Sequence, residues 1–183
     1  MSKINDSEIL ELFHNPQTRE KGFNLLVKKF KEPIYWHLRR ILVNHEDTND
    51  VMQNVFLKIW QHLGKFREDS KLYTWIYRIA TNEAISYIKT SKARFHIQID
   101  SENENYISNN LKDDNYFKPS EIEMKLQKGI LKLPAKQKIV FLLRYYQSMN
   151  YNQMSEVLNT NVNTLKTTYH IAAKKIEEYL KEN

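Results

Sequence analysis

The sequence predicts an all-α protein with two small helical domains joined by a flexible linker. Its 183 residues include only three glycines and four prolines, too few for a protein rich in β-turns. Apolar residues recur at helical spacing on both sides of a central polar segment, which is rich in asparagine and acidic residues and is typical of an unstructured connector. We therefore expect an N-terminal domain over residues 1–92, a linker over residues 93–118 and a C-terminal helix-turn-helix domain over residues 119–183.

The first domain should be a helical bundle. Apolar residues between positions 23 and 30 lead into Pro33, where the helix should break or bend before a stretch over residues 34–43. Residues 52–63 carry apolar side chains at positions i, i+3 and i+4, with aspartates at 47 and 50 complementing the helix dipole and Gly64 ending the helix. Residues 72–88 repeat this pattern and predict a further helix.

The C-terminal domain has clearer helix boundaries. Ser120 and Glu123 form a capping-box pattern, and Pro134 occupies an expected first helical position. A short helix over residues 151–158 is followed by a polar turn at 159–161 and a longer helix over residues 162–180, with Asn161 as its N-cap. Two helices joined by such a turn predict a helix-turn-helix.

Composition restricts the function classes. A net charge of +6 and a pI near 9.3 favour a polyanionic partner such as nucleic acid. The absence of cysteine excludes disulfides, thiolate metal sites and a cysteine nucleophile. A mean hydropathy of −0.67, no apolar stretch near ~20 residues and no export signal at the N-terminus predict a cytoplasmic protein that does not insert into a membrane.

Catalysis has little support in the motifs. The six histidines include no pair at i, i+4, and neither a nucleophile elbow nor a Walker or kinase loop is present. His45, Glu46, Asp47 and Asp50 could imitate a metal cluster, but their place at a helix start is explained more simply by the helix dipole. We expect no enzyme, no cofactor and no metal site.

Two helices have faces that an isolated domain does not explain. Leu57 follows Asp50, Gln53 and Asn54 on the outward side of its helix, where a partner protein would account for an apolar residue. On the next helix, Tyr73 and Tyr77 could stack on unpaired bases, or they could be half-buried packing residues.

The last helix presents amide, hydroxyl and ammonium groups that suit base edges and phosphates, although an ordinary solvated surface would look similar.

Together these segments resemble the extracytoplasmic-function group of bacterial RNA polymerase sigma factors. Three segments carry the resemblance, in the family's order: residues 47–60 (DTNDVMQNVFLKIW), residues 73–82 (YTWIYRIATN), and residues 131–145 followed by 151–175. The first is similar to the family's core-binding helix and the second to its promoter-melting helix. The third is similar to the domain that reads the minus-35 element.

The resemblance implies three sets of site residues. Core polymerase would be bound by Asp50, Gln53, Asn54 and Leu57. The non-template strand of the minus-10 element would be bound by Ser70, Lys71, Arg78, Asn82, Ser86 and Lys89, with Asp69 in the same loop. The minus-35 duplex would be bound by Asn163, Thr164, Lys166, Thr167, His170 and Lys174.

The resemblance also implies partners. These are core RNA polymerase through its largest and second-largest subunits, promoter DNA, and an anti-sigma factor that could hold the protein at the inner membrane. The linker would thread toward the polymerase active-site channel. A stand-alone helix-turn-helix regulator, independent of polymerase, is the alternative function. Whether the two domains pack together in the free chain is left open.

The chain departs from the family pattern at several positions. Asn54 stands where glutamate is common, Asn159 replaces a turn glycine, and uncharged residues occupy four positions that are often basic: Thr81, Thr168, Ile171 and Ala173. Each lost phosphate contact lowers the slope of log affinity against log salt concentration by close to one unit and removes part of the electrostatic attraction to DNA. DNA binding without polymerase should therefore be weak.

Overall fold

The computed structural model describes residues 5–95 and 120–182, with only the backbone described over residues 91–95. The described residues are helical and contain no strand, so the predicted all-α fold class is confirmed. Most of the expected linker lies outside the described residues and stays a prediction. The helix before it continues through Phe95, past the expected domain boundary at residue 92.

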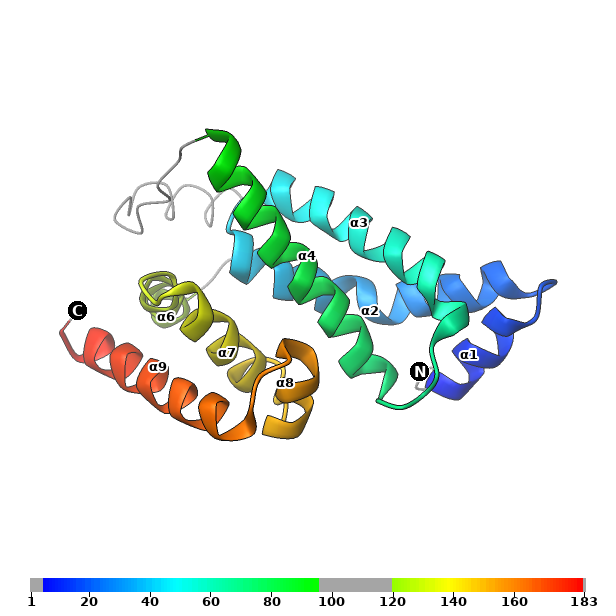
Figure 1. Cartoon of the computed structure of the whole chain (residues 1–183). Helices are drawn as coiled ribbons and strands as arrows, with labels where there is room; N and C mark the ends of the chain where they lie inside the picture. The colour runs from blue at the N-terminus through cyan, green and yellow to red at the C-terminus, as the bar shows by residue number, and fades with distance from the viewer. Residues whose placement is uncertain (1–4, 96–119, 183) are drawn as a thin grey trace.

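The first group of helices contains α1 (Asp6–His14), α2 (Arg19–Leu42), α3 (His45–His62) and α4 (Leu72–Phe95), with a short 3-10 turn at Leu63–Lys65. Figure 1 shows α3 and α4 lying across α2, with α1 folded back beside the N-terminal part of α2. Gly22 allows this close approach, since a Cβ at that position would lie 2.6 Å from the backbone nitrogen of Phe13.

Sequence reasoning did not identify α1. The helix has a weak but readable signal: Asn5 caps it, and Ile9, Leu10 and Phe13 form its buried side. Nine residues are too few for a marked periodic pattern. The helix is held mainly by packing, because Phe13 makes edge-to-face contact with Trp60 of α3, with ring centroids 5.5 Å apart.

Of the break or bend predicted at Pro33, the break is wrong, because α2 runs uninterrupted from Arg19 to Leu42 with this proline inside it. Proline in a helix interior costs about 3 kcal/mol. The apolar stripe of α2 continues on both sides of Pro33, with Phe30 and Ile34 both buried. Burying two such side chains contributes about 1.5–3 kcal/mol each, which is enough to keep the helix continuous.

The second group contains α6 (Glu121–Leu131), α7 (Ala135–Tyr145), α8 (Tyr151–Leu158) and α9 (Val162–Glu182). The capping box is confirmed: Ser120 accepts from the backbone N–H of Glu123, whose carboxylate accepts from the Ser120 N–H. Pro134 precedes α7 as its N-cap, one position earlier than expected. The bounds of α8 are as predicted, and Asn159 ends it in the left-handed conformation.

The two groups pack against each other. One hydrophobic cluster includes buried residues of both, from Ile9 in α1 to Ile176 in α9. α4 lies against α8 and α2 against α7, so the second group covers one side of the first (Figure 1). The sequence left open whether the two domains pack together in the free chain, and the structure shows that they do.

His37 is buried where α2 meets α4. Its Nε2 atom lies 3.0 Å from the Thr81 hydroxyl, and its ring centroid lies 5.0 Å from that of Tyr77. Burial lowers the pKa of His37 to about 3, with a further contribution from the positive charge of Arg40. In the unfolded chain the His37 imidazole therefore takes up a proton near pH 6.5, whereas in the folded chain it stays neutral until the pH is close to 3.

This difference predicts a pH-dependent loss of stability. The contribution of neutral, buried His37 to the free energy of unfolding is complete above pH 6.5. It falls as the pH drops toward 3, at close to 1.4 kcal/mol per pH unit. Between pH 7.5 and 5.0 the wild type should lose about 2 kcal/mol of unfolding free energy that His37→Gln does not lose. Urea unfolding at both pH values measures the difference. The exposed-site control His62→Gln should keep the full dependence, and equal losses in all three proteins would contradict the prediction.

Candidate functional site

The outward side of α3 carries the four residues expected to bind polymerase. Asp50, Gln53, Asn54 and Leu57 are all exposed and follow one another at positions i, i+3, i+4 and i+7. The opposite side of the helix is buried through Val51, Val55 and Ile59. The helix therefore faces its own core with one stripe and presents the other stripe to solvent.

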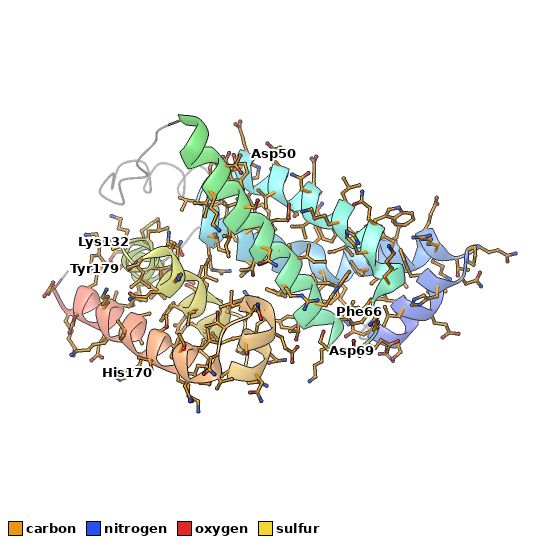
Figure 2. All side chains as sticks on the ribbon, viewed as in Figure 1. Asp50, Phe66, Asp69, Lys132, His170 and Tyr179 are labelled. Atoms are coloured by element: carbon orange, nitrogen blue, oxygen red, sulfur yellow. The ribbon has the colours of Figure 1, made fainter. Side chains whose placement is uncertain are left out.

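Leu57 is the unusual member of this exposed stripe. Its side chain is 55% exposed, and nearby Lys58 pairs with Glu83 of α4. An ion pair of this kind helps to fix the position of α3 on α4 but leaves Leu57 uncovered. Figure 2 shows Asp50 near the start of the same helix.

The start of α3 is held by local hydrogen bonds. The N-cap is Asn44, whose side chain accepts from the backbone N–H of Asp47 at 3.0 Å. Asp47 also accepts from the Tyr87 hydroxyl at 2.6 Å. His45 lies between the Tyr35 hydroxyl and the Asn49 amide, at 2.8 and 2.9 Å. Among the described residues, no group of three potential ligands could hold a metal ion.

A second exposed stripe lies on α4. Arg78, Asn82, Ser86 and Lys89 are all exposed, and their spacing of four, four and three residues keeps them on one face. Lys71 in the preceding loop is exposed, while Ser70 is partly covered. Thr81, at a position where the family often has a basic residue, is buried against His37.

A cleft of about 510 Å³ adjoins this stripe at its N-terminal end. Its walls come from the loop before α4, from α4 itself and from the end of α8; they include Phe66, Asp69, Trp75, Arg78 and Glu156. Figure 2 shows Phe66 and Asp69 in that loop. Arg78 therefore belongs both to the exposed stripe and to a recess lined by aromatic and charged groups.

Tyr73 and Tyr77 are packing residues in this arrangement, and their partner is the other domain. The Tyr77 hydroxyl donates to the side-chain oxygen of Gln147 at 2.6 Å, and the Tyr73 hydroxyl donates to the Gln147 backbone carbonyl at 3.0 Å. Tyr77 is fully buried. Burial raises the pKa of Tyr73 to about 12 and raises the pKa of Tyr77 further.

The docked domains share a second set of contacts around the end of α2. The Arg40 guanidinium lies 3.9 Å from the centroid of the Tyr146 ring, and the Gln127 amide donates to the Arg40 carbonyl at 3.4 Å. Val43 is buried with Leu131 of α6. Sequence reasoning found none of these contacts, because they join residues without a shared motif or period.

The third exposed stripe lies on α9. The six residues expected to contact the minus-35 duplex are all exposed: Asn163, Thr164, Lys166, Thr167, His170 and Lys174. Leu165, Ala172 and Ile176 anchor the opposite side. Asn161 caps the helix by accepting from the Asn163 N–H at 2.8 Å, as predicted. Figure 2 shows His170 on the side of α9 that faces away from α7.

The aromatic ring of Tyr151, at the start of α8, lies close to two cations. The Arg144 guanidinium is 5.2 Å and the Lys166 ammonium 6.0 Å from the ring centroid. Residues 162–176 contain no acidic side chain, so this end of α9 carries only positive formal charge.

No described helix is long and apolar enough to span a bilayer.

Comparisons with known proteins match both halves of the chain. The sigma-70 region 2 model matches residues 26–94, and the sigma-70 region 4 model matches residues 123–176. The ECF RNA polymerase sigma-E factor of Haemophilus influenzae is 32% identical over 169 residues, covering 88% of each chain. The ECF RNA polymerase sigma factor SigW of Bacillus subtilis is 26% identical over 170 residues, covering 89% of this chain and 91% of its own.

Two solved structures share the fold. The sigma factor RpoE in complex with the anti-sigma factor NepR from Bartonella quintana matches with a TM-score of 0.69 and 17% identity, covering 88% of this chain and 98% of the other. CnrH in complex with the cytosolic domain of CnrY matches with a TM-score of 0.68 and 18% identity, covering 97% and 98%.

Proposed function

The chain belongs to the extracytoplasmic-function group of RNA polymerase sigma factors, and from this premise we propose that its three exposed stripes divide the work of transcription initiation. As a sigma factor it acts with core RNA polymerase to direct initiation at specific promoters. In our assignment, α3 binds the polymerase, α4 and its loop capture the melted minus-10 strand, and α9 enters the minus-35 duplex. The observation that carries the assignment is that all three stripes are exposed while their opposite sides form the core.

The α3 stripe suits a protein partner. A half-exposed leucine flanked by amide and carboxylate groups combines an apolar anchor with a polar rim, which is the usual anatomy of a protein interface. The DNA-facing stripes have a different composition, with cations, amides and hydroxyls. This difference supports the assignment of α3 to the polymerase rather than to DNA.

The α4 stripe suits single-stranded DNA. From Arg78 to Lys89 it extends about 16 Å along the helix, with a cation at each end and Asn82 and Ser86 between them. The cations can follow the backbone, while the amide and hydroxyl can hydrogen-bond to exposed bases. The neighbouring cleft provides an aromatic wall through Phe66 and Trp75, where an unstacked base could be held.

Promoter binding requires the docked domains to separate in our proposal. Arg78 shares its cleft with α8 residues, so the C-terminal domain restricts access to the start of the α4 stripe. Separation would break the hydrogen bonds from Tyr73 and Tyr77 to Gln147 and expose both rings. Polymerase binding would supply the free energy for this step.

We also propose an anti-sigma factor as a partner. The matched RpoE of Bartonella quintana is bound to the anti-sigma factor NepR, and the matched CnrH is bound to the cytosolic domain of CnrY. This chain shares the fold of both proteins over 88% and 97% of its length, which supports a partner of the same kind. A cytoplasmic location, or one at the inner membrane through such a factor, belongs to the same proposal.

Replacing Lys166 with alanine tests the α9 assignment. We expect about tenfold less transcription from minus-35-dependent promoters, because a base or phosphate contact of this kind is worth about 1–3 kcal/mol. Run-off transcription with purified core polymerase measures the effect. The control is Lys181→Ala, which removes the same charge about 22 Å further along α9, where the lysine pairs with Glu177.

Two outcomes would contradict the proposal. Equal activity of the Lys166 and Lys181 variants would remove α9 from the minus-35 contact. A mobility shift of promoter duplex that is equally strong with and without core polymerase would instead favour the stand-alone regulator.

A further inference from the structure

Ile171 is an exposed apolar residue on the DNA-facing side of α9. Its side chain is 41% exposed. It follows Thr164 by seven residues and Thr167 by four, which puts all three on one face of the helix. The buried side is occupied by Leu165, Ala172 and Ile176, so Ile171 is not part of the domain core.

The surroundings of Ile171 are those of a nucleic-acid contact. Its exposed neighbours toward the N-terminus of α9 are threonines and a histidine, and residues 162–176 include no carboxylate. The first carboxylate on this face is Glu178, seven residues further on, where it pairs with Lys174. A protein-binding patch on this face would need further exposed apolar residues. The only other large exposed hydrophobic residue on α9, within the described chain, is Leu180, nine residues further on.

The major groove offers one apolar feature to such a side chain. Thymine presents its 5-methyl group there, whereas the other base edges present hydrogen-bond donors and acceptors. Isoleucine has no donor or acceptor with which to read those edges. Its free energy of binding must come from removing apolar surface from water, and the thymine methyl is the partner that allows this.

We infer that Ile171 contacts the 5-methyl group of one thymine in the minus-35 element and thereby specifies a T·A pair at that position. The inference rests on the proposed entry of α9 into the minus-35 duplex and deepens it. Thr164 and Thr167, on the same face, would contact neighbouring base pairs, since seven residues of helix extend about 10 Å.

Replacing thymine with deoxyuridine tests this contact, because uracil lacks only the methyl group and keeps the same base pairing. A minus-35 duplex selected from a randomised library by the holoenzyme would be resynthesised with one thymine changed at a time. We expect about fourfold weaker holoenzyme binding at a single position, which corresponds to loss of one buried methyl group. This experiment needs only holoenzyme that contains the wild-type protein, so it does not depend on the folding of any variant.

Two variants then assign the effect to Ile171. Ile171→Ala should bind the thymine duplex about fourfold less tightly and show no further loss with deoxyuridine. Ile171→Arg should change the selected base at that position from thymine to guanine, which arginine pairs with through two hydrogen bonds. The control Leu180→Ala should retain the full deoxyuridine effect.

The inference is overturned if the wild type tolerates deoxyuridine at every position, or if Ile171→Ala keeps the deoxyuridine effect. The second result would assign the methyl contact to another side chain, such as a threonine methyl group. Failure of the proposed function has a different signature: Lys166→Ala would then leave duplex binding unchanged as well. An Ile171→Ala defect in polymerase association with no change in DNA binding would indicate a protein contact and also overturn the inference.

Discussion

Leu57→Asp should weaken binding to core RNA polymerase by about a hundredfold or more. Burying a leucine at an interface contributes about 1.5–3 kcal/mol, and an unpaired carboxylate buried in its place adds a desolvation penalty of similar or larger size. Because the Leu57 side chain is 55% exposed in the free chain, the variant should fold with unchanged stability. A fluorescence titration of labelled protein with core polymerase measures the affinity, and thermal unfolding checks the fold.

Ile122→Asp is the matched control. It makes the same apolar-to-acidic change at an even more exposed position, 75% exposed, in α6 of the other domain. This variant should bind core polymerase as the wild type does. Equal losses in both variants would indicate a general effect of added negative charge, and unchanged binding by Leu57→Asp would remove α3 from the polymerase interface.

Arg78→Ala combined with Asn82→Ala should reduce open-complex formation by about a hundredfold and leave polymerase affinity unchanged. A hydrogen bond to a charged group contributes about 1.5–3 kcal/mol and a neutral one about 1 kcal/mol, so removing both costs roughly 2.5–4 kcal/mol, and the lower end of this range corresponds to about a hundredfold. The defect should shrink on a promoter whose minus-10 bases are mispaired beforehand, because the cost of unpairing is then absent. Permanganate reactivity of unpaired thymines measures the open complex.

Asn24→Ala with Lys28→Ala is the control pair. It removes an amide and a cation, also four residues apart and exposed, from α2. This double variant should form open complexes normally. A joint loss of polymerase binding and DNA opening by the α4 variant would contradict the division of roles, and so would an undiminished defect on the mispaired promoter.

The helices of the C-terminal domain could be read from the sequence because their signals are local. Ser120 and Glu123 cap α6 through contacts three residues apart, and α8 has the predicted bounds. The end of α8 at Asn159 follows from the ability of asparagine to adopt left-handed geometry. Local patterns failed at Pro33 and α1, where packing across the bundle outweighed propensity or compensated for a short helix.

For α3, α4 and α9, the sequence by itself determined which residues would form the exposed stripe, and hence where the candidate stripes lie. Only the tertiary structure decided that the two domains dock and that Tyr73 and Tyr77 pack against Gln147. The physical reason is the range of the interactions. Helical periodicity can be seen in the sequence because it relates apolar residues three and four positions apart. The docking hydrogen bonds, in contrast, join residues 70 to 87 positions apart. Nothing in a local pattern specifies such pairs, which form only when two completed surfaces meet.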